Sequence, residues 1–457
     1  MIDIRAAFYS SRENPPAFHP SRENSPAVAP ISASLKRTIR RADVQPWPVP
    51  PVVFPTPARD VQIICDRESF TILSTNETIF TPNSLAHAIR YAGEHLMPMQ
   101  SGVVIGIRGI VCGIDMGGPT GYQNKPYAAF WPNLRPIAGL RIVGLDEAAG
   151  IEGVTIWDGM GGVDSVRFEC LTFWNPEHSM TPLLTAMNQV HGLIQCYWCR
   201  FKPMSLNQWM GQGMKWGWRG HGPAQWDMRY CEVSPAQEHS GYGDNYQGTS
   251  YFVGITGGGN GRTFLQHTNR TTSGPTQFGD IIVQDCTCTG VTDFGGGGSD
   301  YTFSGCMGLV YVKNCKSMGA KVASNGAMVF WTDVSNGNYA NANGYTFTRV
   351  LVEGFVADHP SARRSLLMAS GVENFELRDS FVLCGPRPAL DLDTFYGGPK
   401  GNGSVKFYTP TAPSTYRGFA GSERVVKGGR ALSSREIDAM WGNGPATGGS
   451  LIARMLS

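Results

Sequence analysis

Hydrophobic residues recur along this chain in a short unit that repeats about every 30 residues between residues 166 and 382. An apolar residue is followed two positions later by another, three positions further by a small or thiol residue, and after two more by an apolar one. Alternation with a period of two predicts β-strands, and the step of three predicts a bend between two strands. The units begin at Val166, Ile194, Trp226, Ile281, Val310, Tyr345 and Phe375.

The long interval between Trp226 and Ile281 predicts one poorly matching unit near residues 251–255. A fixed period of this size indicates stacked units, none of which buries its own apolar face. The inward position after the bend is expected to be small, so that four thiols form an internal ladder. These are Cys199, Cys231, Cys286 and Cys315.

The positions of the cysteines are better explained by packing in the core than by disulfide formation or metal binding. Their number, 11, is odd, and most lie inside hydrophobic patterns, which favours free thiols over a disulfide framework. Cys196 and Cys199 have Cys-x-x-Cys spacing, but both fall on inward repeat positions and no second pair matches. We therefore predict no metal site and no cofactor.

A helix is predicted near residues 84–93, ahead of the first repeats. Ser84 is the expected N-cap, Leu85 and Ile89 lie on one apolar face, and Gly93 is the expected stop. Such a helix would cover the open sheet edge at the start of the stack.

The two ends of the chain differ in composition from the repeats. Residues 1–58 are rich in proline and predict an extended arm, either a flexible tail or a segment that orders against a partner subunit. Residues 396–457 predict a Gly-rich closing segment with one short helix from Ser434 to Trp441.

Charge and hydropathy exclude several classes of protein. The net charge is only +2 and long basic runs are missing, so nucleic acid is not an expected partner. No apolar segment is long enough for membrane insertion. Residues 1–5 lack the apolar core of a secretory signal, so we expect a protein without a signal peptide.

The repeat and the preceding helix resemble the pectate-lyase-like right-handed parallel β-helix superfamily, which includes bacteriophage tailspikes and other virion surface proteins. The resemblance covers residues 60 to about 395. It implies an all-β fold: a right-handed parallel β-helix solenoid over residues 59–395, with an N-terminal capping helix and the extended Pro-rich arm. It is specific for the fold and not for an activity.

Residues 207–250 hold the richest set of candidate binding residues. Exposed aromatic rings stack on sugar rings, while polar side chains bind their hydroxyl groups. The alternative is that the aromatic residues pack on the solenoid or on another subunit, as Trp226 is expected to do within the repeat. The glycan-binding candidates are Trp209, Trp216, Trp218, His239, Tyr242 and Asn245.

Candidate catalytic residues are less distinct. Glycoside hydrolysis needs two carboxylates, for which Glu238 and Asp244 are the weak candidates and no pair is singled out by spacing. A lyase would need a carboxylate cluster for Ca²⁺, and the single Gly-Gly-x-Gly-x-Asp match at residues 295–300 is more simply a loop. Turn positions are expected for His191 and His267. Further carboxylates considered are Asp285, Asp293, Asp300 and Asp333.

From these observations and the resemblance we expect a structural surface protein of a bacteriophage virion, of the spike or head-decoration type, which contacts host cell-surface glycans. A homotrimer that docks on other virion proteins through its N-terminal arm is the expected assembly, located in the virion. A tailspike polysaccharide depolymerase, hydrolase or lyase, is the alternative, although the sequence favours a non-enzymatic role. A non-viral carbohydrate-binding module is the second alternative.

Overall fold

The computed structural model describes a large part of the unit Val44–Ser457. The predicted arm and the short helix expected from Ser434 to Trp441 lie outside the described residues. The described residues are 60–96, 102–114, 139–153, 155–157, 165–174, 183–186, 193–202, 216–220, 225–233, 239–244, 249–258, 263–269, 279–288, 299–305, 307–318, 326–331, 347–359, 366–369, 372–378, 381–384, 390–391, 404–408, 416–417, 423–427 and 430–431.

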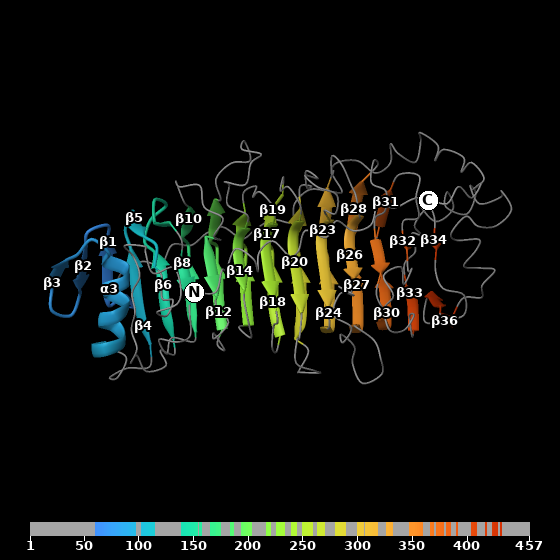
Figure 1. Ribbon diagram of the computed structural model, residues 1–457, viewed down its shortest axis with the longest axis horizontal. Helices are drawn as coiled ribbons and strands as arrows, with labels where there is room; N and C mark the ends of the chain where they lie inside the picture. The colour runs from blue at the N-terminus through green and yellow to red at the C-terminus, as the bar shows by residue number, and fades with distance from the viewer. Residues whose placement is uncertain are drawn as a thin grey trace, which may run out of the picture. The chain divides into compact units, whose positions relative to one another are not determined.

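The described strands form three long sheets, A, B and C (Figure 1). Sheet A has 16 strands, and its pairing is parallel except for β1–β2, β2–β3 and β35–β36. In spatial order its strands are β3 (Glu77–Phe80), β2 (Ser69–Ile72), β1 (Ile63–Asp66), β4 (Val103–Ile107), β6 (Leu140–Gly144), β9 (Val166–Glu169), β12 (Leu193–Tyr197), β15 (Gln225–Arg229), β18 (Thr249–Val253), β21 (Asp280–Gln284), β24 (Met307–Lys313), β27 (Phe347–Glu353), β30 (Val372–Arg378), β33 (Ser404–Tyr408), β35 (Glu423–Lys427) and β36 (Arg430–Ala431).

Sheets B and C have ten strands each and are parallel throughout. Sheet B contains β5 (Ile110–Cys112), β7 (Gly150–Glu152), β10 (Thr172–Trp174), β13 (Arg200–Lys202), β16 (Glu232–Val233), β19 (Thr256–Gly257), β22 (Thr287–Cys288), β25 (Lys316–Met318), β28 (Val356–His359) and β31 (Phe381–Cys384). Sheet C contains β8 (Thr155–Trp157), β11 (Leu184–Ala186), β14 (Trp216–Gly220), β17 (His239–Asp244), β20 (Thr263–Asn269), β23 (Ser299–Gly305), β26 (Gly326–Trp331), β29 (Leu366–Ala369), β32 (Leu390–Asp391) and β34 (Tyr416–Arg417).

Successive turns of the chain contribute one strand to each sheet in a fixed order. β9 lies in sheet A, β10 in sheet B and β11 in sheet C, and the chain then returns to sheet A as β12, beside β9. The predicted all-β class with stacked parallel strands is therefore confirmed. The poorly matching unit expected near residues 251–255 is present as β18 and β19.

Alternation along each strand of sheet A separates core from surface. Val166 and Phe168 in β9 are buried, as are Ile194 and Cys196 at the paired positions in β12. Aromatic rings also stack between turns, since Phe173 and Phe201 lie 5.0 Å apart with nearly parallel planes. Adjacent turns thus complete each other's core, as the repeat predicted.

The thiol ladder is present but interrupted. Cys199, Cys231, Cys286 and Cys315 are all buried, and none of the described cysteines forms a disulfide. Ile255 occupies the same position in the turn between Cys231 and Cys286, and it is equally buried. The prediction that this position must be small is therefore wrong, because the core also accommodates a branched side chain there.

The bend between sheets A and B depends on a backbone conformation that the repeat did not reveal. The residue before the inward position has a positive φ in successive turns, for example 53° at Trp198 and 54° at Tyr230. The backbone N–H of Trp198 donates to the carbonyl oxygen of Arg229 in the next turn at 2.9 Å. Interstrand hydrogen bonding thus continues through the bend and offsets the cost of a left-handed residue.

The first turn is closed differently from the prediction. Helix α3 (Ser84–Tyr91) continues into a π-helical turn, η2 (Ala92–Leu96), rather than stopping at Gly93. Asn83 is the N-cap and makes no side-chain capping bond, whereas Ser84 Oγ donates to the Asp66 carbonyl oxygen. The helix packs against β1, β2 and β5, while the hairpin β2–β3 forms the edge of sheet A (Figure 1).

Three further expectations differ from the structure. The unit placed at Tyr345 is out of register, because Val350 pairs with Val310. His267, expected at a turn, lies inside β20 and is fully buried, with its ring 4.6 Å from that of Phe252. Parallel pairing also continues past residue 395, since β33 pairs with β30.

Candidate functional site

The structure places part of the predicted glycan-binding stretch on two paired strands of sheet C. Trp216 and Trp218 lie in β14, and His239 and Tyr242 lie in β17. In parallel register Trp216 pairs with His239, Trp218 with Gly241, and Tyr242 with Arg219.

The remaining candidates of that stretch are distributed differently. Asp244 ends β17 and pairs with Thr268 in β20. Trp209, Glu238 and Asn245 lie outside the described residues, and so the groove expected from these residues and its Glu238–Asp244 carboxylate pair stay predictions.

The other carboxylates considered for catalysis do not meet in the described residues. Asp300 is buried and accepts a hydrogen bond from Ser317 Oγ. Asp285 occupies a left-handed bend position and accepts a 2.9 Å hydrogen bond from Gln284 Nε2. Asp293 and Asp333, like His191, lie outside these ranges.

Metal-ligand chemistry finds no support in the described part of the chain. Within it no group of three or more His, Cys, Asp or Glu side chains is close enough to hold an ion. Cys196 and Cys199 are both buried in the core, as predicted from their repeat positions. Burial raises the pKa of the Cys196 thiol well above its usual value, which disfavours the thiolate that a metal or a reaction would need.

A polar cluster that the sequence did not single out lies on the outer face of sheet A. Its side chains come from β6, β9, β12 and β15, at positions that alternate with buried core residues. We call it the arginine–tyrosine cluster, and its members are Arg141, Arg167, Glu169, Gln195, Tyr197, Asp227 and Arg229.

Glu169 anchors one half of this cluster. Its Oε1 accepts a 2.8 Å hydrogen bond from Arg141 Nε, and Arg167 Nε lies 2.9 Å from the same oxygen. The Glu169 side chain is only 7% exposed, so its charge is screened little by solvent. The hydrogen bond to Glu169 raises the pKa of Arg141.

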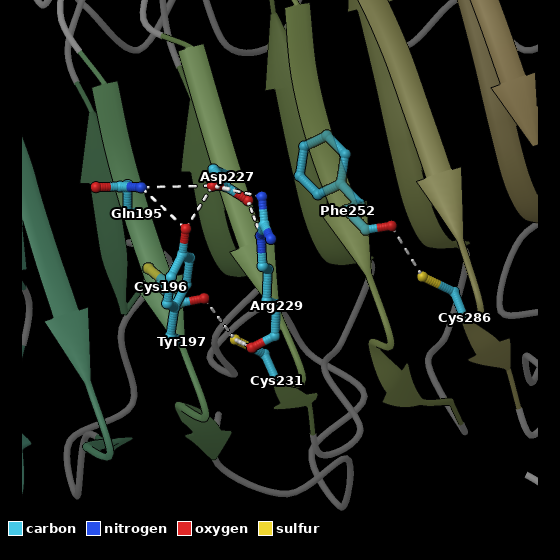
Figure 2. Close-up of polar contacts among 8 residues, drawn as sticks. All are labelled: Gln195, Cys196, Tyr197, Asp227, Arg229, Cys231, Phe252 and Cys286. Carbon is cyan, nitrogen blue, oxygen red and sulfur yellow. Dashed lines mark hydrogen bonds and ion pairs between the residues drawn. The ribbon is translucent and has the colours of Figure 1, made fainter. Parts of the chain in front are cut away.

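Asp227 anchors the other half, shown in Figure 2. Tyr197 Oη donates to Asp227 Oδ2 at 2.6 Å, and Arg229 donates from Nε to Oδ1 at 2.8 Å. Gln195 Nε2 lies 3.0 Å from Tyr197 Oη and 3.4 Å from Asp227 Oδ2. The Asp227 carboxylate is thus surrounded by donors from two adjacent strands.

Tyr197 links the two halves through its ring. The guanidinium carbon of Arg167 lies 4.1 Å from the ring centroid, and that of Arg229 lies 5.4 Å from it. Burial, followed by the hydrogen bond to Asp227, raises the pKa of Tyr197 to about 12. The phenol therefore remains a donor at any physiological pH.

The outer face becomes more aromatic on the next strands. Tyr251 in β18 pairs with Asp227, and it is 38% exposed. Further along, Tyr311 Oη donates to Glu353 Oε2 at 2.8 Å. Charged groups and an exposed aromatic ring therefore lie on adjacent strands of one face.

The sequence carried a signal for this cluster. Arg167, Gln195 and Asp227 hold the same outward position in consecutive repeats, and Glu169, Tyr197 and Arg229 hold the next one. Aligning the repeats on their buried residues brings these complementary groups side by side. The contacts of Arg141 with Glu169 and of Tyr197 with Asp227 join adjacent turns, so no local motif reveals them.

Comparison with protein-family models, with curated proteins and with solved structures found no match to this chain. In the described part of the chain, no helix is both long and apolar enough to cross a membrane.

Proposed function

We propose that this chain is a right-handed parallel β-helix that serves as a structural surface protein of a bacteriophage virion and contacts host cell-surface glycans. Stacked turns that share three parallel sheets support the β-helix. The right-handed sense of the proposed helix rests on the strong preference of parallel β crossover connections for that hand. The virion role, as spike or head-decoration protein, rests on the resemblance of the repeat to such proteins.

Glycan contact is carried by one observation: Tyr251 is exposed beside the arginine–tyrosine cluster on the outer face of sheet A. An aromatic ring offers an apolar face to a sugar ring, and fixed polar groups beside it select hydroxyl or charged substituents. Rungs about 4.8 Å apart along a rigid sheet suit a repetitive polymer.

A binding role is favoured over hydrolysis at this cluster. Glu169 and Asp227 are nearly covered, and their oxygens already accept hydrogen bonds from arginines, so neither is placed to donate a proton to a bound sugar. A glycosidase needs one of its two carboxyl groups protonated as a general acid. The polysaccharide depolymerase therefore remains the second candidate, resting on the predicted Glu238 and Asp244 pair.

Assembly is part of the proposal. We expect a homotrimer attached to other virion proteins through the arm at residues 1–58. Sedimentation analysis of the full chain should give three times the mass of the monomer, and removal of residues 1–58 should abolish attachment to particles while leaving the trimer intact. A monodisperse monomer would contradict the proposed assembly.

The glycan role is tested with purified full chain and bacterial lipopolysaccharide or capsule preparations. We expect saturable binding that is weakened by Tyr251→Ala, with no shortening of the polysaccharide on gel electrophoresis. Shortened chains that persist in Tyr251→Ala but vanish in Glu238→Ala would favour the depolymerase instead. Absence of binding to any surface polysaccharide would contradict the glycan role.

A further inference from the structure

In the described part of the chain, Arg167 is positioned by a ring contact and an ion pair rather than by hydrogen bonds. Its guanidinium stacks on Tyr197, and its Nε is buried close to Glu169 but is not aligned for a hydrogen bond. Among the described residues, no hydrogen bond is formed by the guanidinium group of Arg167. A half-buried, fixed guanidinium with free donors is an unfilled site for a planar anion.

The acidic and basic side chains of the cluster differ in their exposure to solvent. The carboxylates are nearly covered, with exposed side-chain fractions of 7% for Glu169 and 9% for Asp227. The arginines remain accessible, at 36% for Arg141, 32% for Arg167 and 43% for Arg229. Three cations at the surface above two covered anions leave a positive potential facing solvent.

The strand register places two of these cations at paired positions on neighbouring strands. Arg141 in β6 pairs directly with Arg167 in β9, so their backbones are one interstrand spacing apart, about 4.8 Å. Arg141 commits only its Nε to Glu169. One carboxylate or phosphate group can therefore accept hydrogen bonds from both guanidinium groups at once.

We propose that Arg141 and Arg167 clamp an anionic substituent of an acidic polysaccharide, and that Arg229 contacts the next charged residue of the polymer. This rests on the proposed glycan role and specifies its ligand as a sugar that carries a carboxylate or a phosphate. The fixed Tyr197 ring below Arg167 keeps the guanidinium flat, which lowers the entropy lost on binding.

The test uses the full chain and three polymers: polygalacturonate for carboxylates, teichoic acid for phosphates, and neutral dextran. Calorimetry should detect polygalacturonate, teichoic acid or both, but not dextran, and binding should weaken as salt is raised from 50 to 300 mM. Arg167→Gln should reduce affinity at least tenfold, and Arg167→Lys should recover it only in part. The polymer that responds to Arg167→Gln identifies the substituent.

Arg200→Gln is the matched control. Arg200 lies on sheet B with a side chain that is 51% exposed, and its Nε lies 3.7 Å from Glu232 Oε2. The substitution removes the same charge from a different sheet, so affinity should stay within twofold. Equal losses in Arg167→Gln and Arg200→Gln would mean unspecific charge attraction and would overturn the clamp.

Three other outcomes would also overturn it, and the first two separate the clamp from the glycan role. Binding of neutral but not acidic polymers would leave the glycan role in place and remove the clamp, whereas binding of no polymer would remove both. If Arg167→Gln dissociates the oligomer, its free donors face a neighbouring subunit and not a glycan. Equal unfolding midpoints of the variant and the original chain keep misfolding out of the interpretation.

Discussion

The thiol of Cys231 lies 3.2 Å from the carbonyl oxygen of Cys196, in the preceding turn of the chain. The same relationship joins Cys286 to the Phe252 carbonyl oxygen at 3.3 Å (Figure 2). A cysteine in this column is therefore both a compact core side chain and a weak donor across turns. Neighbouring turns are linked at this point through side chain and backbone together.

Replacing Cys231 with either a smaller or a larger residue should destabilise the fold. Cys231→Ala should lower the free energy of unfolding by about 1–2 kcal/mol through the lost contacts. Cys231→Leu should lower it by about 1–3 kcal/mol, because the column is already packed. Urea unfolding followed by circular dichroism measures both changes. As a control, replacement of the exposed neighbouring residue, Glu232→Ala, should change the free energy of unfolding by no more than about 0.5 kcal/mol. A stabilising Cys231→Leu would contradict close packing of this column.

His267 should make the fold sensitive to mild acid. Burial lowers its pKa from 6.5 to about 3, so between these values the unfolded chain binds a proton that the folded chain does not. Stability should be complete above pH 6.5 and fall as the pH drops, by roughly 2 kcal/mol at pH 5. Unfolding midpoints measured from pH 7 to pH 4 should show a shallower loss in His267→Phe, whose ring preserves the stacking with Phe303. Identical slopes in the two proteins would argue against a buried neutral imidazole.

Gly254 should resist substitution for two separate reasons. Its φ is +64°, and a Cβ atom there would lie 2.6 Å from Tyr230 Cδ1. Gly254→Ala should therefore cost about 2–4 kcal/mol. Gly109 has a similar φ of +60° but open space around it, so Gly109→Ala should cost only about 1 kcal/mol. Equal thermal unfolding midpoints of the two variants would remove the steric contribution.

Tyr197 should stabilise the fold only while its phenol is protonated. Tyr197→Phe should cost about 1–3 kcal/mol near pH 8, since it removes the donor to Asp227. Because the folded pKa is raised to about 12, this difference should persist to pH 10 and shrink as the pH approaches 12. Chemical unfolding of both proteins at pH 8, 10 and 11.5 gives the comparison. A difference that grows with pH would have the wrong sign for this hydrogen bond.

The repeat was readable in the sequence where apolar residues face a common core. Val166, Ile194 and Trp226 follow a period-two pattern that only a strand satisfies, and their stacking follows from that pattern. The register at Val350 was missed because Phe347 on the same strand is also buried, so two alignments fit the apolar residues.

The remaining features depend on contacts between turns. The positive φ at Trp198 is stabilised by a hydrogen bond from the next turn, and a bulky residue at that position carries no local turn signal. His267 is predicted at a turn because no triad or metal motif accompanies it, whereas aromatic rings from its own turn and from the next turn pack against it. The arginine–tyrosine cluster likewise exists only once four turns are aligned.

Alternation along β12 has an evolutionary consequence. Ile194 and Cys196 support the interior, while Gln195 and Tyr197, which alternate with them, are half-buried on the outer face. Under the proposed glycan role, recognition of a different polymer can therefore arise by single substitutions at outward positions, with no new loop and no repacking. Descendants of this chain should then diverge fastest at every second residue of sheet A, while the buried residues that form the scaffold stay unchanged.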